Sequence, residues 1–374
     1  MKILYLQNIR LPTEKAHGLQ VMETCHSLAL AGHEVNLVIG SYLSLEENGI
    51  FGVYDIEKNF SIKKVPVSFG RQDPEHTSFL MKSIIFVYNA WRSYGKSSFD
   101  IVYTRDTLTA LVFSMLGKKV FYEIHDVRHS LLQKLALQKA VGVISITRGL
   151  VDYCESIGVK KEKICIAPDA VDLAEFQIRA TQRECREKLG LPQDKKIVLY
   201  TGHLYSWKGA DTFAESAQFL DENTMVSFVG GHDYDIEVFK KRFANAHISV
   251  LGRKSHDLMP YYMKAADVLV LPNSAKEDIS RLYTSPIKLF EYMASSQPIV
   301  ASDLPSLREV LTEKNCTFFE ADNAESLAGT IKKVLVDAQS AGILAEQALI
   351  DVQEYTWQKR AQKIIDFIKT TKHD

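Results

Sequence analysis

The chain has 374 residues, of which 46% are hydrophobic and 24% are charged. This is the balance of a folded globular protein, and the length exceeds one ordinary hydrophobic core, so we expect two domains. The 45 basic and 46 acidic side chains leave a net charge of −1. That balance disfavours nucleic acid as a partner, because proteins that bind its phosphates usually carry a basic excess.

The five cysteines are scattered and form no C-x-x-C pair. The sequence therefore predicts neither a disulfide framework nor a zinc site, and it favours a reducing cytoplasm. The first apolar run, 3–6, is too short for the apolar region of a signal peptide. No stretch approaches the ~18 uninterrupted apolar residues of a membrane span. We expect a cytoplasmic protein whose only membrane contact is peripheral, at the inner face of the cytoplasmic membrane.

Short apolar runs alternate with amphipathic segments along the first half of the chain. Two helices are expected over 19–31 and 78–94, each followed by a glycine suited to a helix C-terminus. This alternation predicts a doubly wound α/β domain with a mainly parallel sheet over residues 1–175. The strands expected in it cover 3–6, 34–39, 100–103, 119–123, 141–146 and 163–167.

The pattern loosens into a charged stretch over 176–196 and then restarts. It predicts a second Rossmann-like domain over 190–355, followed by one amphipathic helix from Tyr355 to about Thr370. Ligands of such sheets bind at the carboxyl ends of the strands, so a cleft between the two domains is the expected site. The strands expected in the second domain cover 197–200, 225–229, 248–251, 267–271 and 298–302.

The segment after Tyr283 contains most of the functional information. Ser285 is a natural N-cap and Pro286 suits the first helical position, so a helix is expected to begin there. Lys288 then lies in the first turn, where a cation is unfavourable unless an anion such as phosphate occupies the helix N-terminus. Glu291 shares a face with Lys288 and could accept both hydroxyl hydrogens of a ribose. An ordinary Lys–Glu pair on a surface helix is the alternative that these residues leave open.

A second basic element, Gly202-His203-Leu204-Tyr205-Ser206-Trp207-Lys208-Gly209, directly follows the strand at 197–200. A strand, a glycine turn and a lysine before a helix suit a phosphate cradle built from backbone amides and the lysine. The segment matches neither the P-loop nor the G-x-G-x-x-G pattern. On these residues alone, Lys208 could equally be a solvated side chain.

These two segments, in this order and about eighty residues apart, resemble the retaining glycosyltransferase family 4, which has the GT-B architecture. Five other stretches, spread over nearly the whole chain, are similar to the family's pattern. They are Lys15–Gly18 (the N-terminal glycine loop), Tyr122–Asp126 (the strand with a catalytic-site His), Ile166–Asp172 (the end of the first domain), Tyr262–Pro272 (the strand before the donor site) and Tyr355–Trp357 (the start of the final helix).

The resemblance implies two Rossmann-like domains facing a cleft. Residues 1–175 would bind the acceptor, joined by a C-terminal helix, 356–372, that crosses back to them, and residues 190–355 would bind a nucleotide-sugar donor. Lys208 and Lys288 would hold the donor diphosphate and act in catalysis, and Glu291 would bind the ribose. His125, the third catalytic residue, would hydrogen-bond a sugar hydroxyl. The other donor-binding residues implied are Gly18, His203, Arg253 (beside the base), Tyr283, Thr284, Ser285, Pro286 and Ile287.

The implied reaction is transfer of a hexose-type sugar from a UDP- or GDP-sugar to a hydroxyl acceptor, with retention of configuration and with no metal or other cofactor. Cell-envelope glycan or glycolipid synthesis would be its setting. Two lysines and a helix N-terminus would stabilise the charge that develops on the leaving diphosphate. No carboxylate presents itself as a covalent nucleophile, so a leaving phosphate oxygen is the expected base.

Three positions that border the expected donor site depart from the family pattern. Tyr283 stands where a Glu eight residues before Glu291 is common, and Glu277 or Asp278 could substitute for it. His203 stands where an Arg often helps the phosphate-binding lysine, and 16–18 replace a more common Gly-Gly pair. The missing Glu keeps a non-catalytic nucleotide-sugar-binding relative open as an alternative. A nucleotide-sugar epimerase, which can use the same two-domain architecture, is the other alternative.

Two further segments yield weaker expectations. Asp233-Tyr234-Asp235 has the D-x-D form of a metal site in another glycosyltransferase architecture, but it reads here as a solvated loop. The helix at 78–96 reads mainly as a core helix. The basic residues on and near it could instead face lipid phosphates, which favours a lipid-linked or glycan acceptor and peripheral attachment to a membrane. These residues are Lys82, Arg92, Lys96, Arg128, His129 and Lys134.

Overall fold

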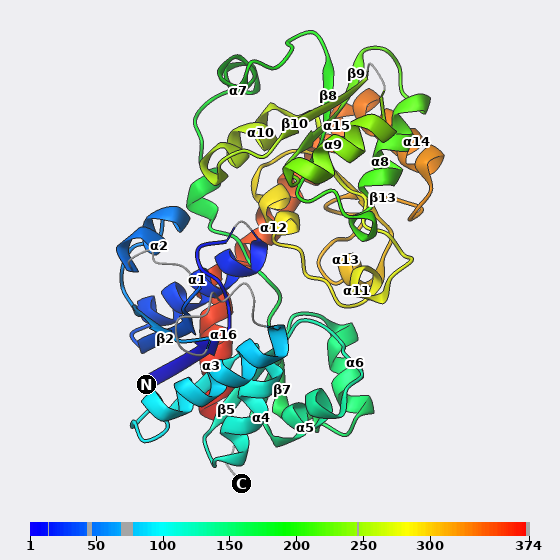
Figure 1. Cartoon of the computed structure of the whole chain (residues 1–374). Helices are drawn as coiled ribbons and strands as arrows, with labels where there is room; N and C mark the ends of the chain where they lie inside the picture. The colour runs from blue at the N-terminus through cyan, green and yellow to red at the C-terminus, as the bar shows by residue number, and fades with distance from the viewer. Residues whose placement is uncertain (14, 43–46, 69–77, 245–246, 372–374) are drawn as a thin grey trace. The chain divides into compact units, whose positions relative to one another are not determined.

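The computed structural model describes residues 1–13, 15–42, 47–68, 78–244 and 247–371. The chain folds into two compact units: unit 1 comprises Met1–Asp169 and Trp357–Asp374, and unit 2 comprises Ala170–Thr356 (Figure 1). The chain thus leaves unit 1 at residue 169, whereas the sequence placed the end of the first domain at residue 175. The C-terminal helix belongs to unit 1, as the GT-B resemblance implied.

Unit 1 is built on a seven-stranded sheet in the order β3-β2-β1-β4-β5-β6-β7, with every neighbouring pair parallel. This is the strand order of a doubly wound fold, and it confirms the α/β class predicted for this part of the chain. The strands are β1 (Lys2–Gln7), β2 (Glu34–Gly40), β3 (Ser61–Val65), β4 (Ile101–Thr104), β5 (Val120–Ile124), β6 (Gly142–Ser145) and β7 (Ile164–Ile166).

The helices of unit 1 lie between these strands, except for the last, which comes from the end of the chain. They are α1 (Ala16–Leu30), α2 (Glu47–Tyr54), α3 (Phe79–Tyr94), α4 (Thr107–Met115), α5 (Leu131–Lys139), α6 (Arg148–Ser156) and α16 (Trp357–Thr370). In Figure 1, α16 (red) runs beside α1, which it contacts. Apolar side chains of α16, among them Ile364 and Ile365, lie fully buried in the same core as those of β1 and α1.

Unit 2 is built on a six-stranded parallel sheet in the order β10-β9-β8-β11-β12-β13. Its strands are β8 (Lys196–Thr201), β9 (Thr224–Val229), β10 (Ile248–Gly252), β11 (Val268–Leu271), β12 (Ile299–Ser302) and β13 (Thr317–Phe319). Its helices are α7 (Gln182–Leu189), α8 (Ala210–Ser216), α9 (Asp233–Arg242), α10 (Met259–Ala265), α11 (Asp278–Arg281), α12 (Ile287–Ala294), α13 (Pro305–Arg308), α14 (Ala324–Val336) and α15 (Ala338–Asp351).

The structure corrects several local predictions. The charged stretch at 176–196 contains α7. A capping box formed by Thr181 and Glu184 lies at the start of this helix, and Gly190, in the left-handed conformation, lies at its end. The predicted D-x-D loop is wrong, because Asp233 and Asp235 form the first turn of α9, where acidic side chains are favoured by the helix dipole.

The prediction that the helix at 78–96 is mainly a core helix is also wrong. Ile85, Phe86, Val87 and Ala90 of α3 are buried, but a second apolar set on the same helix is exposed to solvent. Phe79 and Leu80 are exposed to 68% and 64%, and the set continues along the helix with Met81, Ile84, Tyr88 and Trp91. A sequence pattern identifies apolar faces, but it does not show which of them another element covers.

Because α16 supplies part of the core of unit 1, we expect Ile364→Ala to lower the free energy of unfolding by about 2–5 kcal/mol, the usual cost of a cavity at a fully buried site. Urea denaturation would measure it. The matched control is Ile343→Ala at an exposed position of α15, which should change the free energy by less than about 0.5 kcal/mol. Equal losses in both variants would contradict a core role for α16.

Candidate functional site

Two glycines form the floor of the candidate site in unit 2. Gly202 follows β8 with a φ of 130°, and Gly230 follows β9 with a φ of 120°. Their backbones pack so closely that a Cβ on Gly230 would lie 2.9 Å from the carbonyl carbon of Gly202. Only glycine combines such φ values with this close approach. The carboxyl ends of the adjacent strands β8 and β9 therefore meet with their backbones in contact.

A tyrosine on α12 fixes the position of that helix against the end of β8. The Tyr292 hydroxyl accepts a hydrogen bond from the backbone N–H of Thr201 at 2.8 Å. This contact brings the first turn of α12 to the glycine floor, since the Lys288 ammonium lies 3.9 Å from the Cβ position of Gly202. The same ammonium lies 3.9 Å from the centroid of the buried Tyr200 ring, a cation–π distance.

The two lysines predicted to bind phosphate lie in one strongly perturbed environment. The Nζ atom of Lys288 is enclosed and has no hydrogen-bond partner among the described residues. Burial and the nearby charge of Lys208 hold the pKa of Lys288 well below its ordinary value, against the attraction of Glu291. Burial also lowers the pKa of Lys208 to about 8, and its ammonium lies 5.1 Å from the Trp207 ring centroid. Two neighbouring buried ammonium groups repel each other and lack solvation, and a bound anion would compensate for both costs.

Glu291 lies in the same helix and is only 9% exposed. Burial raises its pKa above the ordinary range, against the opposing attraction of His256. The His256 ring itself is paired with Glu175 at 3.2 Å. A nearly buried carboxylate beside Lys288 is available to accept hydroxyl hydrogens, as the sequence implied for a ribose.

The predicted start of the helix at this site is corrected by one residue. Pro286 has extended backbone angles and forms the N-cap in place of Ser285, and α12 begins at Ile287. The first helical hydrogen bond runs from the Leu289 N–H to the Pro286 carbonyl, which explains why the proline lies outside the helix. Lys288 still falls in the first turn, as predicted.

Most of the other donor-binding residues predicted in unit 2 lie after β10 or in the segment between α11 and α12, and Ile287 is the first residue of α12. Arg253 follows β10 and is exposed, whereas Tyr283 and Thr284 are partly exposed and Ser285 and Ile287 are buried. Burial raises the pKa of the Tyr283 phenol. Of the two carboxylates that could replace the missing Glu, Asp278 forms an ion pair with Arg281 at 2.6 Å. Asp278 is exposed on the short helix α11, and its carboxylate is already paired there.

His203 belongs to a stack of rings that the sequence did not predict. Its ring lies parallel to that of Tyr205, with centroids 5.1 Å apart, and 4.7 Å from the ring of His232. Trp207 extends the stack on the far side of Tyr205. The close spacing of His203, Tyr205 and Trp207 in the sequence could have indicated this stack. The contribution of His232, which follows β9, could not be predicted because only the fold brings it near His203.

Gly18 and His125 lie in unit 1, and the remaining predicted site residues lie in unit 2. Gly18 occupies the first turn of α1, which begins at Ala16, earlier than the predicted residue 19. A Cβ there would overlap the Tyr54 hydroxyl and come within 2.5 Å of the Thr13 methyl group. Packing within unit 1 thus already requires glycine at this position.

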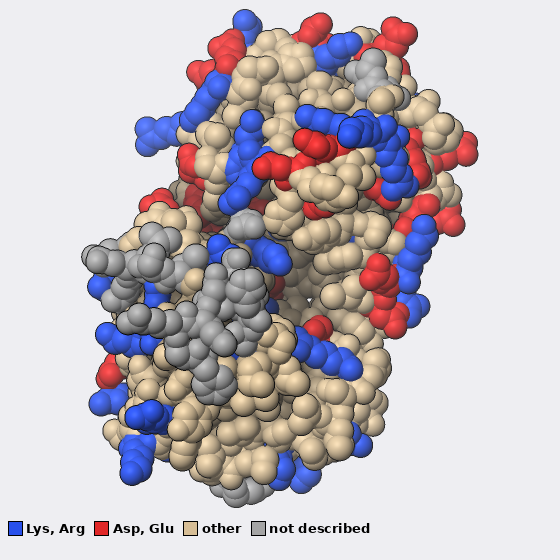
Figure 2. Space-filling model, in the orientation of Figure 1, with Lys and Arg blue, Asp and Glu red and all other residues tan. Residues whose placement is uncertain are grey.

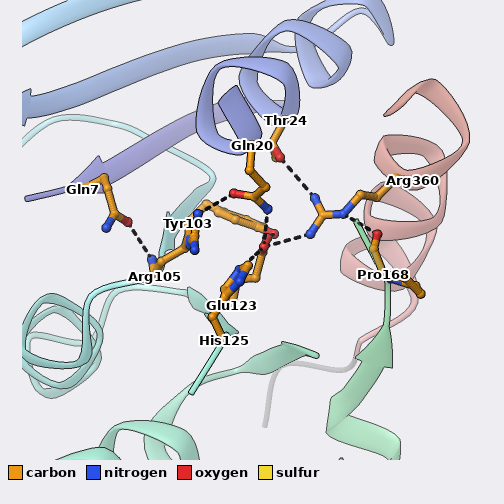
Figure 3. A network of polar contacts seen from close by, with 9 residues as sticks. All are labelled: Gln7, Gln20, Thr24, Tyr103, Arg105, Glu123, His125, Pro168 and Arg360. Carbon is orange, nitrogen blue, oxygen red and sulfur yellow. Dashed lines mark hydrogen bonds and ion pairs between the residues drawn. The ribbon is translucent and has the colours of Figure 1, made fainter. Parts of the chain in front are cut away.

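His125 follows β5 directly and takes part in a buried polar network (Figure 3). Its Nε2 atom lies 2.6 Å from Oε1 of Glu123, a carboxylate that is 0% exposed. Arg360 of α16 donates to the same oxygen at 2.8 Å. The sequence analysis gave no role to Glu123 or to its partners other than His125. The only local signal was a carboxylate inside the apolar run Val-Phe-Tyr-Glu-Ile.

Among the described residues, no group of three or more His, Cys, Asp or Glu side chains is placed to hold a metal ion. Over the same residues, no helix has the length and the apolar character needed to cross a bilayer.

Comparison with known proteins supports the predicted resemblance. Residues 181–349 match the family model of glycosyl transferases group 1. An uncharacterized glycosyltransferase of Methanocaldococcus jannaschii is 24% identical over 249 residues, which are 64% of this chain and 62% of that protein. The UDP-Gal:alpha-D-GlcNAc-diphosphoundecaprenol alpha-1,3-galactosyltransferase of Escherichia coli is 23% identical over 257 residues, 60% and 62% of the two chains. The chain thus spans less than two thirds of the length of these curated relatives.

The fold is shared with the sucrose-phosphate synthase of Thermosynechococcus elongatus, with a TM-score of 0.80 over 99% of this chain and 98% of that one, at 19% identity. The predicted fold class is therefore confirmed, and the family resemblance is confirmed for residues 181–349. A retaining mechanism and membership of family 4 stay predictions.

The lowered lysine pKa values predict that anion binding takes up protons. Above about pH 7.5 the terminal phosphate of a nucleoside diphosphate, with a second pKa of about 6, is almost fully ionised, while Lys208, with a pKa of about 8, is partly neutral. A bound anion favours the ammonium form, so the lysine pKa rises and a proton enters from solvent. Calorimetry of UDP and GDP binding in buffers of different ionisation enthalpy should show larger proton uptake at about pH 8.5 than at about pH 7.5.

Affinity should fall over the same interval, because more of the lysine must be protonated on binding. Lys288→Met should reduce both the affinity and the uptake. The control Lys332→Met, on the exposed side of α14, should change neither. Proton release, or an affinity that does not depend on pH between these values, would show that the lysines are not the anion site.

Proposed function

We propose that this chain, whose residues 181–349 match the glycosyl transferases group 1, is a retaining glycosyltransferase that needs no metal. It would move a hexose-type sugar from a UDP- or GDP-sugar to a hydroxyl acceptor. The observation that carries the proposal is the enclosed Lys288 ammonium, which has no hydrogen-bond partner among the described residues and lies next to Lys208 and the N-terminus of α12. Such a site is complete only with an anion in it.

In the proposed reaction, the bond between the sugar anomeric carbon and the diphosphate oxygen breaks, and a bond to the acceptor oxygen forms on the same face. The acceptor hydroxyl proton passes to an oxygen of the leaving diphosphate. Negative charge therefore grows on the diphosphate as the reaction proceeds. Lys208 and Lys288 attract it more strongly in the transition state than in the ground state, and this difference lowers the barrier.

The donor's nucleoside would be held by groups that α12 and β10 position. The carboxylate of Glu291 would accept the ribose hydroxyls, and the backbone beside Arg253 would contact the base. The E. coli relative is named for a UDP-sugar, which supports a uridine donor over a guanosine donor. Tyr283 would face the sugar with a neutral phenol where the family more often has a carboxylate.

The acceptor is proposed to be a glycan or a lipid-linked glycan at the inner face of the cytoplasmic membrane. The exposed apolar side chains of α3 defined above form the surface that supports peripheral attachment. Figure 2 shows a broad uncharged area on this part of unit 1, with Lys and Arg more prominent than Asp and Glu at its edge. Lys82 and Arg92 of the same helix would attract anionic headgroups. The name of the E. coli relative includes a lipid diphosphate acceptor, which agrees with this setting.

We expect UDP or GDP, but not both equally, to raise the melting temperature of the chain. A ligand at about 100 times its dissociation constant adds roughly 2.7 kcal/mol to the free energy of unfolding. Lys288→Ala should abolish this stabilisation, whereas Lys332→Ala should preserve it. Stabilisation that persists in Lys288→Ala, or none in the wild type with UDP, GDP or ADP, would overturn the donor-site assignment.

Product analysis then separates the alternatives. A transferase forms product only when an acceptor is present. Because the proposed transferase needs no metal, its activity should also persist in EDTA. Conversion of the donor sugar without an acceptor would identify an epimerase. Donor binding with no conversion, across a panel of lipid-linked and glycan acceptors, would favour the non-catalytic alternative.

The membrane surface makes a separate prediction. Leu80→Glu combined with Ile84→Glu places two carboxylates in the exposed face of α3. Binding to vesicles containing anionic lipid should fall by about tenfold or more, because each charge near such a surface is worth about 1 kcal/mol. Vesicle co-sedimentation at low salt would measure it.

The control replaces two exposed apolar side chains of unit 2 in the same way, Ile343→Glu with Ile350→Glu on α15. This control should retain vesicle binding apart from a small general effect of net charge. If the wild type ignores anionic vesicles, or if both double variants lose binding equally, attachment through α3 is wrong.

A further inference from the structure

His125 is held at one ring nitrogen by a carboxylate that has no access to solvent. Its Nε2 atom lies 2.6 Å from Oε1 of Glu123, and the histidine side chain is itself only 19% exposed. An ionised carboxylate can only accept hydrogen bonds, so the proton of this contact must lie on Nε2 of the histidine. The partner of one ring nitrogen thus decides what the other nitrogen can do.

The carboxylate cannot turn away from this contact, because donors from three other elements converge on it (Figure 3). Tyr103 of β4 donates to Oε2, and the Gln20 amide of α1 donates to Oε1. Arg360 of α16 donates to Oε1 at 2.8 Å. Arg360 is fixed in turn by the Pro168 carbonyl at 2.9 Å and by the Thr24 hydroxyl at 3.1 Å.

The charges of the network agree with this assignment. Burial opposes ionisation of Glu123, but the Arg360 guanidinium and the hydrogen bond from His125 hold its pKa below the ordinary range. Burial, and the charge of Arg105 beside the ring, lower the pKa of His125 to about 4. His125 is therefore a neutral imidazole near pH 7, and its Nδ1 atom bears no proton.

We propose that Glu123 and Arg360 are positioning residues that lock His125 as the Nε2-protonated tautomer. Its Nδ1 atom is thereby offered as a hydrogen-bond acceptor to a hydroxyl of the donor sugar. The proposal rests on the proposed function, since it takes the donor sugar as the ligand of His125. It also specifies the class of group recognised: a neutral acceptor selects a hydroxyl and rejects a carboxylate or a phosphate oxygen at that place.

A purely structural role is the alternative, because the same ion pair also holds α16 in unit 1. The tautomer of His125 tests the first step of the proposal, and activity in a His125→Asn background tells the two roles apart. We expect ¹⁵N-labelled histidine in the full chain, assigned by comparison with His125→Asn, to show a neutral ring protonated at Nε2 between about pH 6 and pH 8. A ring protonated at Nδ1, or a charged ring near pH 7, would overturn the proposal.

The variant Glu123→Leu with Arg360→Met removes both charges together, so that neither ion is left buried without its partner. We expect a mixture of tautomers at His125 and a fall in kcat of about 10- to 100-fold, the usual effect of losing a group that orients a functional histidine. Binding of UDP or GDP alone, which unit 2 would supply, should change by less than about twofold.

The matched control is Arg186→Met with Asp267→Leu, which removes an ion pair of 2.7 Å from the interior of unit 2. It should lower stability and leave the His125 tautomer unchanged. In a His125→Asn background, the Glu123 and Arg360 substitutions should lower kcat no further, because they act through the missing ring. Equal losses in both backgrounds would show a structural role only.

These outcomes are separable from the fate of the proposed function. If the wild type transfers no sugar from any donor, the transferase assignment fails, while the tautomer measurement still tests whether Glu123 and Arg360 fix the ring. If transfer occurs and the ring shows the other tautomer, the transferase stands and the positioning role is lost.

Discussion

The ion pair between Glu123 and Arg360 is the constraint on which unit 1 depends. It joins residues 237 positions apart, and both side chains are almost completely buried. A carboxylate within a central strand is costly unless a cation and further donors surround it. That requirement explains why the chain must return from unit 2 before unit 1 is complete. Arg360 also binds the carbonyl of Pro168, next to residue 169, where the chain leaves unit 1. One guanidinium, on the helix with which the chain returns, therefore holds both the outgoing and the returning segment in unit 1.

The buried lysine at position 288 in unit 2 has the opposite surroundings. The Lys288 ammonium lies above the ring of Tyr200 and near a second lysine, and among the described residues it has no hydrogen-bond partner, in contrast to Glu123. A fold tolerates such an arrangement only where packing elsewhere over-determines it, as the Tyr292 contact to Thr201 does here. Fully satisfied charges stabilise a structure, whereas unsatisfied ones provide free energy for binding. The Glu123 network and the Lys288 site therefore differ in how far hydrogen bonds from the described residues satisfy their buried charges.

This difference also explains what the sequence could predict. Lys208 and Lys288 could be predicted because their signals are local in the sequence. Lys208 follows a strand and a glycine turn, and Lys288 lies in the first turn of a helix. The Glu123 network is not visible, because its members come from α1, β4, β5 and α16 and only the fold brings them together. The two strands that were missed, β3 and β13, are the outer strands of their sheets, where fewer apolar residues are needed. For α3, the apolar residues were recognised correctly, but their exposure depends on neighbours that periodicity does not report.

The departure from the family pattern at Tyr283 also concerns the charge of a side chain predicted to lie near the donor. Tyr283 stands where a carboxylate is common. Its phenol is uncharged near pH 7, as an ordinary tyrosine is, and burial raises its pKa further. His125 is likewise neutral near pH 7, for reasons of burial and of the charge of Arg105. Both of these side chains, which the family resemblance places near the donor sugar, are therefore uncharged near pH 7. Discrimination between sugars would then depend on the direction of individual hydrogen bonds, which a neutral phenol and an imidazole of fixed tautomer can define.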